Sequence, residues 1–208
     1  MNYPYSLIEN AVGISSENLI GFKNQTELEK TLLHVQNLIL SSKTLLLNGF
    51  YSQSLFISIT SLEEIAKIEV CIFRGFKNTA LSKRSKDPLF NHKEKHKIAT
   101  NPIILIGNRL KKSIDEKRLN KIFSDLQEGK FIEIRENCLY FQRNSNSLFV
   151  PQEKKIKDLS FELFLIIIEM MDDKFGGVTN KASQIVDEIN ELYQEVEIKY
   201  KNNLQHDV

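Results

Sequence analysis

The chain contains no tryptophan, and its 208 residues include only two cysteines, four prolines and eight glycines. So few prolines and glycines exclude a β-sandwich or β-barrel with many tight turns, and the long stretches without either residue favour helices. The cysteines, Cys71 and Cys138, are far apart and form no Cys-x-x-Cys pair. We therefore expect two reduced thiols that pack as small apolar groups, and neither a disulfide framework nor a bound metal or other cofactor.

The sequence also lacks a long hydrophobic run. The most apolar stretch, 159–171, is apolar at ten of its thirteen positions but contains Glu162 and Glu169. It is shorter than the roughly 20 residues that span a bilayer, so we expect it to be the central helix of a soluble bundle. The first four residues have neither the basic flank nor the apolar core of a signal peptide. These features predict a cytoplasmic protein with no membrane partner.

The composition is that of an ordinary folded domain, with 41% hydrophobic and 26% charged residues. Those fractions exclude a disordered or collagen-like chain. A domain of this length buries about 70% of its unfolded-chain surface and needs no metal or disulfide to fold. We expect a single domain over 1–208, with 1–24 and 201–208 at its periphery.

Two long helices are predicted first. The capping-box pattern from Thr26 to Glu29 marks a helix start, and Gly49 marks the end of that helix. A second helix is expected from about Ser52 to Arg74, so that the two form an antiparallel hairpin. Apolar residues recur with the helical period in both. They are Leu28, Leu32, Val35, Ile39 and Leu46 in the first helix, and Leu55, Ile59, Leu62, Ala66, Val70 and Phe73 in the second.

The second half predicts further helices around one small hairpin. A third helix is expected from about Leu89 until Pro102 bends or breaks it, and a short helix within 113–136. The alternating residues on either side of 144–147 indicate a β-hairpin at 138–150. An apolar helix should run from Pro151 to about Lys174 and end at Gly176-Gly177, and the chain should fray after Lys201, beyond a last helix that contains Ala182 to Val196. The fold class is therefore all-α: an antiparallel bundle of five or more helices with a possible small hairpin.

Charge is unevenly distributed along the chain, although the net charge is only +1. Residues 74–121 contain fourteen Lys or Arg against four Asp or Glu, whereas 162–208 contain four against ten. The basic block has two interpretations: a surface that meets phosphates or an acidic protein, or solvated helix faces that the acidic last helix neutralises. No aromatic residues alternate with these lysines in the manner of single-strand-binding proteins.

Three groups of polar residues are candidates for chemistry. The first is Glu63, Glu64 and Lys67, which lie within an apolar helix. Either Glu63 and Lys67, four residues apart, form an ordinary surface pair, or one or both acids meet a cation from another element in a polar cluster. The second is His92 and Lys95 with His96, four residues after His92. A zincin would need Glu where Lys93 stands, so we favour phosphate binding or acid–base chemistry over metal binding, with a plain surface histidine as the alternative.

The third group is Arg135 and Tyr140, which means little alone. In order, Ser61 to Lys67, Phe90 to Lys95, Arg135 to Tyr140 and then Pro151 resemble the motifs of the AbiV family of phage abortive-infection proteins. That family belongs to the HEPN-like helical superfamily, and the resemblance covers roughly 26–175.

The resemblance implies a cytoplasmic bacterial defence protein that arrests growth after phage infection, through translation, with a phage protein as its activator. It also implies a helical fold and a homodimer. Many HEPN domains are metal-independent ribonucleases that use Arg, four to six residues, then His. Here seven residues separate Arg84 from His92, and Tyr140 stands where Arg135 would need a His. The motif is therefore not intact, although His92, Lys95, Arg135 and Tyr140 could still converge on a phosphate.

Three interpretations follow from these residues. The first is an effector that binds or cleaves RNA. The second is a non-catalytic module that senses a phage protein and blocks host machinery, including the translation apparatus, by binding. In the third, the charged motifs only hold the helices of a structural bundle together.

Overall fold

Two long antiparallel helices, α2 (Gln25–Leu47) and α3 (Tyr51–Arg74), form the predicted hairpin of the computed structural model. The structure describes residues 6–16, 19, 21–75, 80–101, 108–151 and 156–206. Gly49 takes a left-handed conformation (φ +83°) in the turn between the helices, as a helix stop should. Where the helices cross, Ser42 hydrogen-bonds Ser54 and Ser58 at 2.9 and 2.8 Å. These short side chains satisfy one another inside the core.

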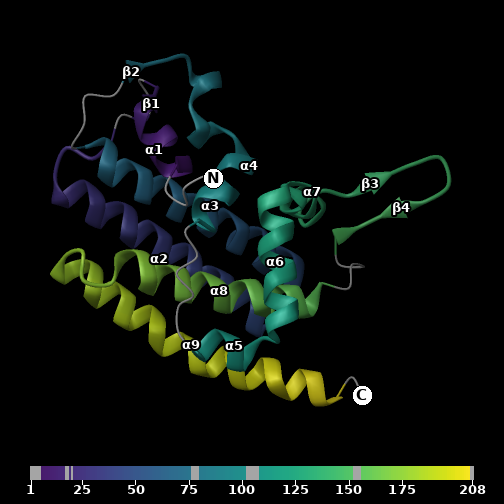
Figure 1. Ribbon diagram of the computed structural model, residues 1–208. Helices are drawn as coiled ribbons and strands as arrows, with labels where there is room; N and C mark the ends of the chain where they lie inside the picture. Colours follow the sequence, from purple (N-terminus) through teal and green to yellow (C-terminus); the bar gives the residue numbers. More distant parts are fainter. Residues whose placement is uncertain are drawn as a thin grey trace.

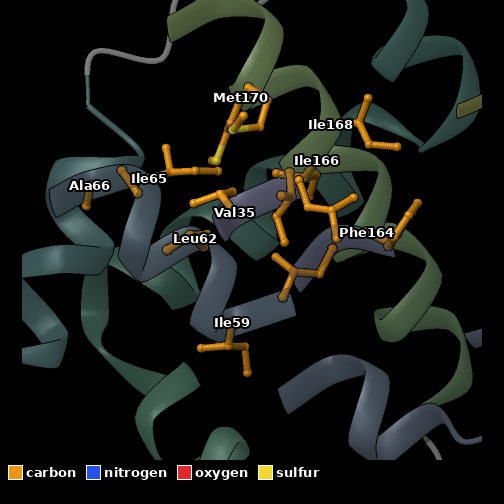
Figure 2. Packing of buried hydrophobic residues seen from close by; sticks show 14 of the residues in the cluster. Val35, Ile59, Leu62, Ile65, Ala66, Phe164, Ile166, Ile168 and Met170 are labelled. Carbon is orange, nitrogen blue, oxygen red and sulfur yellow. The ribbon is translucent and has the colours of Figure 1, made fainter. Parts of the chain in front are cut away.

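The core is completed by α8 (Lys157–Phe175) and α9 (Asn180–His206), which pack on the α2–α3 hairpin. All of 160–171 is buried, which confirms the predicted central helix. Figure 2 shows the resulting core, in which Leu62 and Ile65 of α3 lie near Val35 of α2 and Ile166 and Met170 of α8. The fold is an all-α bundle, as predicted (Figure 1).

Three short helices lie beside α3 and α8. Helix α4 (His92–Ala99) packs on both α3 and α6 (Glu116–Glu128). Helix α5 (Asn108–Ser113) contacts α8, and α7 (Lys130–Asn137) contacts α3. After α7, strands β3 (Gln142–Arg143) and β4 (Leu148–Phe149) pair in antiparallel register, Gln142 with Phe149 and Arg143 with Leu148. This confirms the predicted hairpin, which projects away from the bundle (Figure 1).

The N-terminal segment is tied to the end of α3 by hydrogen bonds from Arg74, which also forms a buried ion pair with Asp87. Helix α1 (Ser6–Gly13) packs on α3, and β1 (Ile14–Ser15) pairs in parallel with β2 (Ala80–Leu81). Two 3-10 turns, η1 (Arg84–Lys86) and η2 (Pro88–Phe90), follow. Arg74, fully buried, binds Asp87 at 2.8 Å and donates to the carbonyl of Ala11 at 2.6 Å. Ile8, Ala11 and Val12 are buried, so α1 contributes to the core, whereas we expected 1–24 to be peripheral.

Several predicted boundaries were wrong. Helix α2 is capped not by Thr26 but by Asn24, which accepts from the backbone amide of Glu27 at 3.0 Å. The same pattern, a polar residue followed three positions later by Glu, occurs two residues earlier at Asn24 and Glu27. Asn is a stronger N-cap than Thr. The single helix expected within 113–136 is instead α6 and α7, because Gly129 takes a left-handed conformation (φ +87°) that ends one helix before the next begins.

Other differences lie at helix ends. Helix α4 starts at His92, not near Leu89, because Asn91 caps it by accepting from the amide of Glu94. Helix α8 starts at Lys157, not at Pro151, and α9 continues to His206 where fraying was expected. Phe73, assigned to the buried stripe of α3, is 49% exposed. Pro102, expected to bend or break the third helix, lies outside the described residues.

Candidate functional site

Two helices place the first two candidate groups against each other. Glu63 lies in the middle of α3, and His92, Lys95 and His96 occupy positions i, i+3 and i+4 of α4. Residues with that spacing share one side of a helix. Since α4 packs on α3, all three side chains reach the same carboxylate.

The carboxylate of Glu63 accepts three hydrogen bonds from α4. His92 Nδ1 lies 2.7 Å and His96 Nε2 3.2 Å from its Oε1, and Lys95 Nζ lies 2.5 Å from its Oε2. We call these four residues, with Arg135, the Glu63 cluster. The cluster confirms the expectation that Glu63 meets a cation, Lys95, from the His92–Lys95 helix.

These bonds keep Glu63 ionised. Burial by itself would raise the pKa of the carboxyl, but hydrogen bonds from His96 and Lys95, together with the charge of Lys95, outweigh burial and lower its pKa to about 2. An ionised carboxylate can only accept hydrogen bonds, so His92 Nδ1 must carry the hydrogen that lies between the two groups. The lone pair of a neutral His92 is therefore on Nε2, the nitrogen that points away from Glu63.

Arg135 joins the cluster from α7. Its Nε lies 4.0 Å from Oε1 of Glu63, an ion pair without a hydrogen bond, and its guanidinium carbon lies 4.7 Å from the ring centroid of Phe56. A guanidinium held over an aromatic face is oriented by cation–π attraction. Arg135 therefore lies beside the same carboxylate as His92 and Lys95, while their convergence on a phosphate stays a prediction.

The cluster has a buried interior and an exposed edge. The side chains of Glu63, Lys95 and His96 are 4%, 6% and 0% exposed. By contrast, the His92 side chain is 41% exposed and that of Arg135 is 25% exposed. A ligand would therefore meet His92 and Arg135, which we call the His92–Arg135 edge. Lys95 instead acts behind this edge, where its ammonium is bound to Glu63.

The remaining candidates lie elsewhere. Glu64 pairs with Lys67 at 2.5 Å, and both side chains are about a quarter exposed, so this is an ordinary helix-surface pair in which Glu64 takes the place expected of Glu63. The side chain of Tyr140 is 65% exposed, and in the described part of the chain it makes no hydrogen bond to the Glu63 cluster. The structure therefore does not bring Tyr140 into the cluster.

Sequence reasoning missed other buried charges, which link elements of the fold to one another. The Arg74–Asp87 pair has a local signal, since Asp87 precedes a proline and its carboxylate caps the following turn at Leu89. On α8, Glu162 accepts from Arg118 at 2.6 Å and from the Tyr200 hydroxyl at 3.0 Å, and Glu169 pairs with Arg109. For the two pairs on α8, the signal in the sequence was a single acid, Glu162 or Glu169, within an apolar helix.

These contacts also answer part of the question about the basic block. Two of its arginines, Arg109 and Arg118, are neutralised inside the fold by acids of α8. Ser113 adds a link from the same block to α9, where it donates to Glu197 at 2.7 Å. The acids that pair with these two arginines thus come from α8, whereas the contact of Ser113 with the last helix involves no basic residue.

The comparisons with known proteins give one match. The sequence model of the AbiV family, HEPN_AbiV, matches residues 26–170, more than half of the chain. No curated protein and no solved structure matches. Within the described residues, no helix is long and apolar enough to cross a membrane, and no group of three or more His, Cys, Asp or Glu side chains is arranged to hold a metal ion.

Proposed function

Because this chain belongs to the AbiV family of HEPN proteins, a family of abortive infection and phage defence, we propose that it arrests growth by engaging RNA at the His92–Arg135 edge. The proposed setting is the bacterial cytoplasm, with a phage protein as activator and translation as the process that stops. The observation that carries the proposal is the orientation of His92, whose Nδ1 is held by Glu63 while its ring is 41% exposed.

The chemistry of this edge suits a phosphodiester. Arg135 can offer its remaining N–H donors to phosphate oxygens as a planar fork. His92 Nε2 can accept a hydrogen bond or a proton from a neighbouring hydroxyl, as a general base does. Behind them, Lys95 compensates the charge of Glu63, so that an incoming phosphate does not face an unpaired carboxylate. Glu63 and Lys95 are thus positioning residues for the two that would touch the ligand.

If the site cleaves RNA, one bond to phosphorus forms while another breaks, and His92 carries the proton. The 2′-hydroxyl gives its proton to Nε2 of His92 as its oxygen bonds to the adjacent phosphorus. The bond from phosphorus to the 5′-oxygen breaks, and that oxygen takes up a proton from the imidazolium or from water. Arg135 would stabilise the charge that develops on the phosphate oxygens. The family's Arg-to-His spacing is absent from this sequence, so the histidine would come from α4 and the arginine from α7.

The test is plaque counting on cells that carry His92→Ala. We expect this variant to lose phage protection while its circular dichroism melt stays close to that of the unchanged protein, because His92 is the most exposed member of the cluster. His34→Ala provides a matched control, since His34 is an exposed histidine of α2. Full protection by a normally folded His92→Ala protein would contradict the proposal.

Total-RNA sequencing after infection distinguishes RNA cleavage from RNA binding without cleavage. New RNA ends that are absent in the His92→Ala strain would indicate cleavage. Intact RNA with stalled translation, again dependent on His92, would indicate binding alone.

The proposed active form is a homodimer. Leu33 and Leu40, seven residues apart on α2, are 38% and 42% exposed, and such a pair on one side of a helix suits a helix from a second copy. Light scattering coupled to size exclusion should give about twice the chain mass of 24.1 kDa at micromolar concentration. A monomer would contradict this part of the proposal.

A further inference from the structure

We propose that the β3–β4 hairpin, with the residues that lead into it, is an arm that binds single-stranded RNA by stacking bases on Tyr140 and Phe141. This inference rests on the proposed function, because it adds a second contact surface for the RNA that the His92–Arg135 edge engages and specifies that this RNA is single-stranded. We call residues 139–150 the arm.

The arm exposes two aromatic residues and one large aliphatic residue. Tyr140 is 65% and Phe141 69% exposed, and Leu148 on the returning strand is 53% exposed. Figure 1 shows this segment projecting from the bundle beyond α7. Large apolar side chains that gather on a protruding element indicate a binding surface.

The chemistry of the arm favours a nucleic acid. Its twelve residues include no Asp or Glu and one cation, Arg143, and its tip is made of Asn and Ser. Phe141 and Arg143 are two residues apart in an extended segment and therefore share a face. An aromatic ring and a guanidinium are both planes on which a base of any identity can stack, and the guanidinium also attracts the phosphate backbone.

The arm is held in place at both roots, so it can present these side chains without first folding. At one root Cys138 is fully buried, and the side-chain nitrogen of Gln142 donates to the side-chain oxygen of Asn137. At the other root Ser52 of α3 donates to the carbonyl of Pro151 at 2.7 Å. Presenting a preformed surface avoids the entropic cost of ordering it on binding.

The tip has its own internal order. The side-chain oxygen of Asn144 accepts from the backbone amides of Asn146 and Ser147, at 3.0 and 2.7 Å. The amide of Asn144 in turn donates to the carbonyl of Ser147 at 3.0 Å. These bonds close the turn between β3 and β4.

The arm and the His92–Arg135 edge are aligned along one face of α3. Ser52, Phe56 and Glu63 are spaced by four and then seven residues, which places them on the same side of the helix. Ser52 holds the root of the arm, Phe56 carries Arg135, and Glu63 holds His92. At ~1.5 Å per residue, Ser52 and Glu63 are about 16 Å apart along the helix, so one strand of a few nucleotides could span both.

The experiment measures the affinity of the full chain for a fluorescein-labelled 2′-O-methyl RNA of about 12 nucleotides, within the site sizes usual for such proteins. This probe has no 2′-hydroxyl to act as a nucleophile, so binding is measured without cleavage. We expect Tyr140→Ala and Phe141→Ala each to weaken binding about tenfold, since stacking on one base contributes roughly that much. Phe73→Ala is the matched control, because Phe73 is an exposed aromatic at the opposite end of α3, and it should leave the affinity unchanged.

Two further measurements test the chemistry. Arg143→Ala should reduce the slope of log affinity against log salt by about 0.7, the change expected when one phosphate contact to a single strand is lost. Duplex RNA of the same sequence should compete poorly, because its bases are already stacked.

The inference is overturned if the Tyr140→Ala, Phe141→Ala double variant binds the probe as tightly as the unchanged chain. It is also overturned if that variant converts a dimer to a monomer without changing RNA affinity, since the arm would then be an interface between copies. The two proposals fail separately. If cells with His92→Ala keep protection but the arm binds RNA, only the proposed function fails. If those cells lose protection but the arm does not bind RNA, only this inference fails.

Discussion

Replacing Glu63 by Gln is the most direct perturbation of the cluster, because it removes one charge and keeps the shape of the side chain. The unchanged carboxylate accepts from His92, Lys95 and His96. The amide has one oxygen for these three donors, and its NH₂ group would face a cation. The ammonium of Lys95, which is 6% exposed, would lose its partner.

Two estimates of the cost agree. Breaking a buried ion pair by removing one partner typically costs about 3–5 kcal/mol. Independently, the pKa of Glu63 falls from its ordinary value of 4.5 to about 2, which corresponds to about 3 kcal/mol at ~1.36 kcal/mol per pH unit. We expect Glu63→Gln to lower the free energy of unfolding by about 3 kcal/mol and Tm by about 10 °C for a chain of this length.

Glu64→Gln is the matched control. It makes the same change at the next residue, where the carboxylate pairs with Lys67 and is about a quarter exposed. An i, i+3 surface pair contributes about 0.2–0.5 kcal/mol, so this variant should remain within about 0.5 kcal/mol of the unchanged protein. Urea denaturation at pH 7, followed by circular dichroism, measures both variants.

The pH dependence provides a second readout. The pKa of Glu63 is lower in the folded than in the unfolded chain, so its contribution to stability is fully present above about pH 4.5. That contribution is lost as the pH falls from about 4.5 toward 2, because the unfolded chain takes up the proton first. The Glu63→Gln protein should therefore lose less stability over this window. Equal unfolding free energies for the Glu63→Gln and Glu64→Gln proteins at pH 7 would refute the reasoning.

Two further substitutions test the packing of the N-terminal segment. Asp87→Asn should cost about 3 kcal/mol in urea denaturation, because it leaves the fully buried Arg74 without its counter-charge; a cost under 1 kcal/mol would contradict the role assigned to this pair. Gly21→Ala should destabilise the protein by about 1–3 kcal/mol, since its φ is +135° and a Cβ there would lie 2.7 Å from the backbone nitrogen of Gly75. Gly13→Ala is its control and should change little in a thermal melt, because a Cβ at Gly13 meets nothing within 4 Å.

Local features of the sequence predicted most of the helical framework. The apolar period of α2 and α3 and the stop at Gly49 depend on contacts within a few residues, and so they can be read without the fold. Where local signals competed, as between Asn24 and Thr26 for the start of α2, the prediction was wrong by one or two residues. Gly129 could have signalled the break between α6 and α7, but a glycine alone does not distinguish a tolerated helix residue from a stop.

The sequence determined by itself that charged residues lie inside the apolar helix α3 and that His92, Lys95 and His96 share one side of another helix. Only the tertiary structure decided which acid they meet. Glu63 and Glu64 are adjacent and chemically alike, but consecutive residues point about 100° apart around a helix, so the packing of α4 on α3 buries one and leaves the other partly exposed. In the same way, Tyr140 follows Arg135 by five residues, yet α7 ends between them and the chain turns outward into the arm. Spacing along a chain specifies a face only while the helix continues, and which face meets a partner depends on elements distant in the sequence.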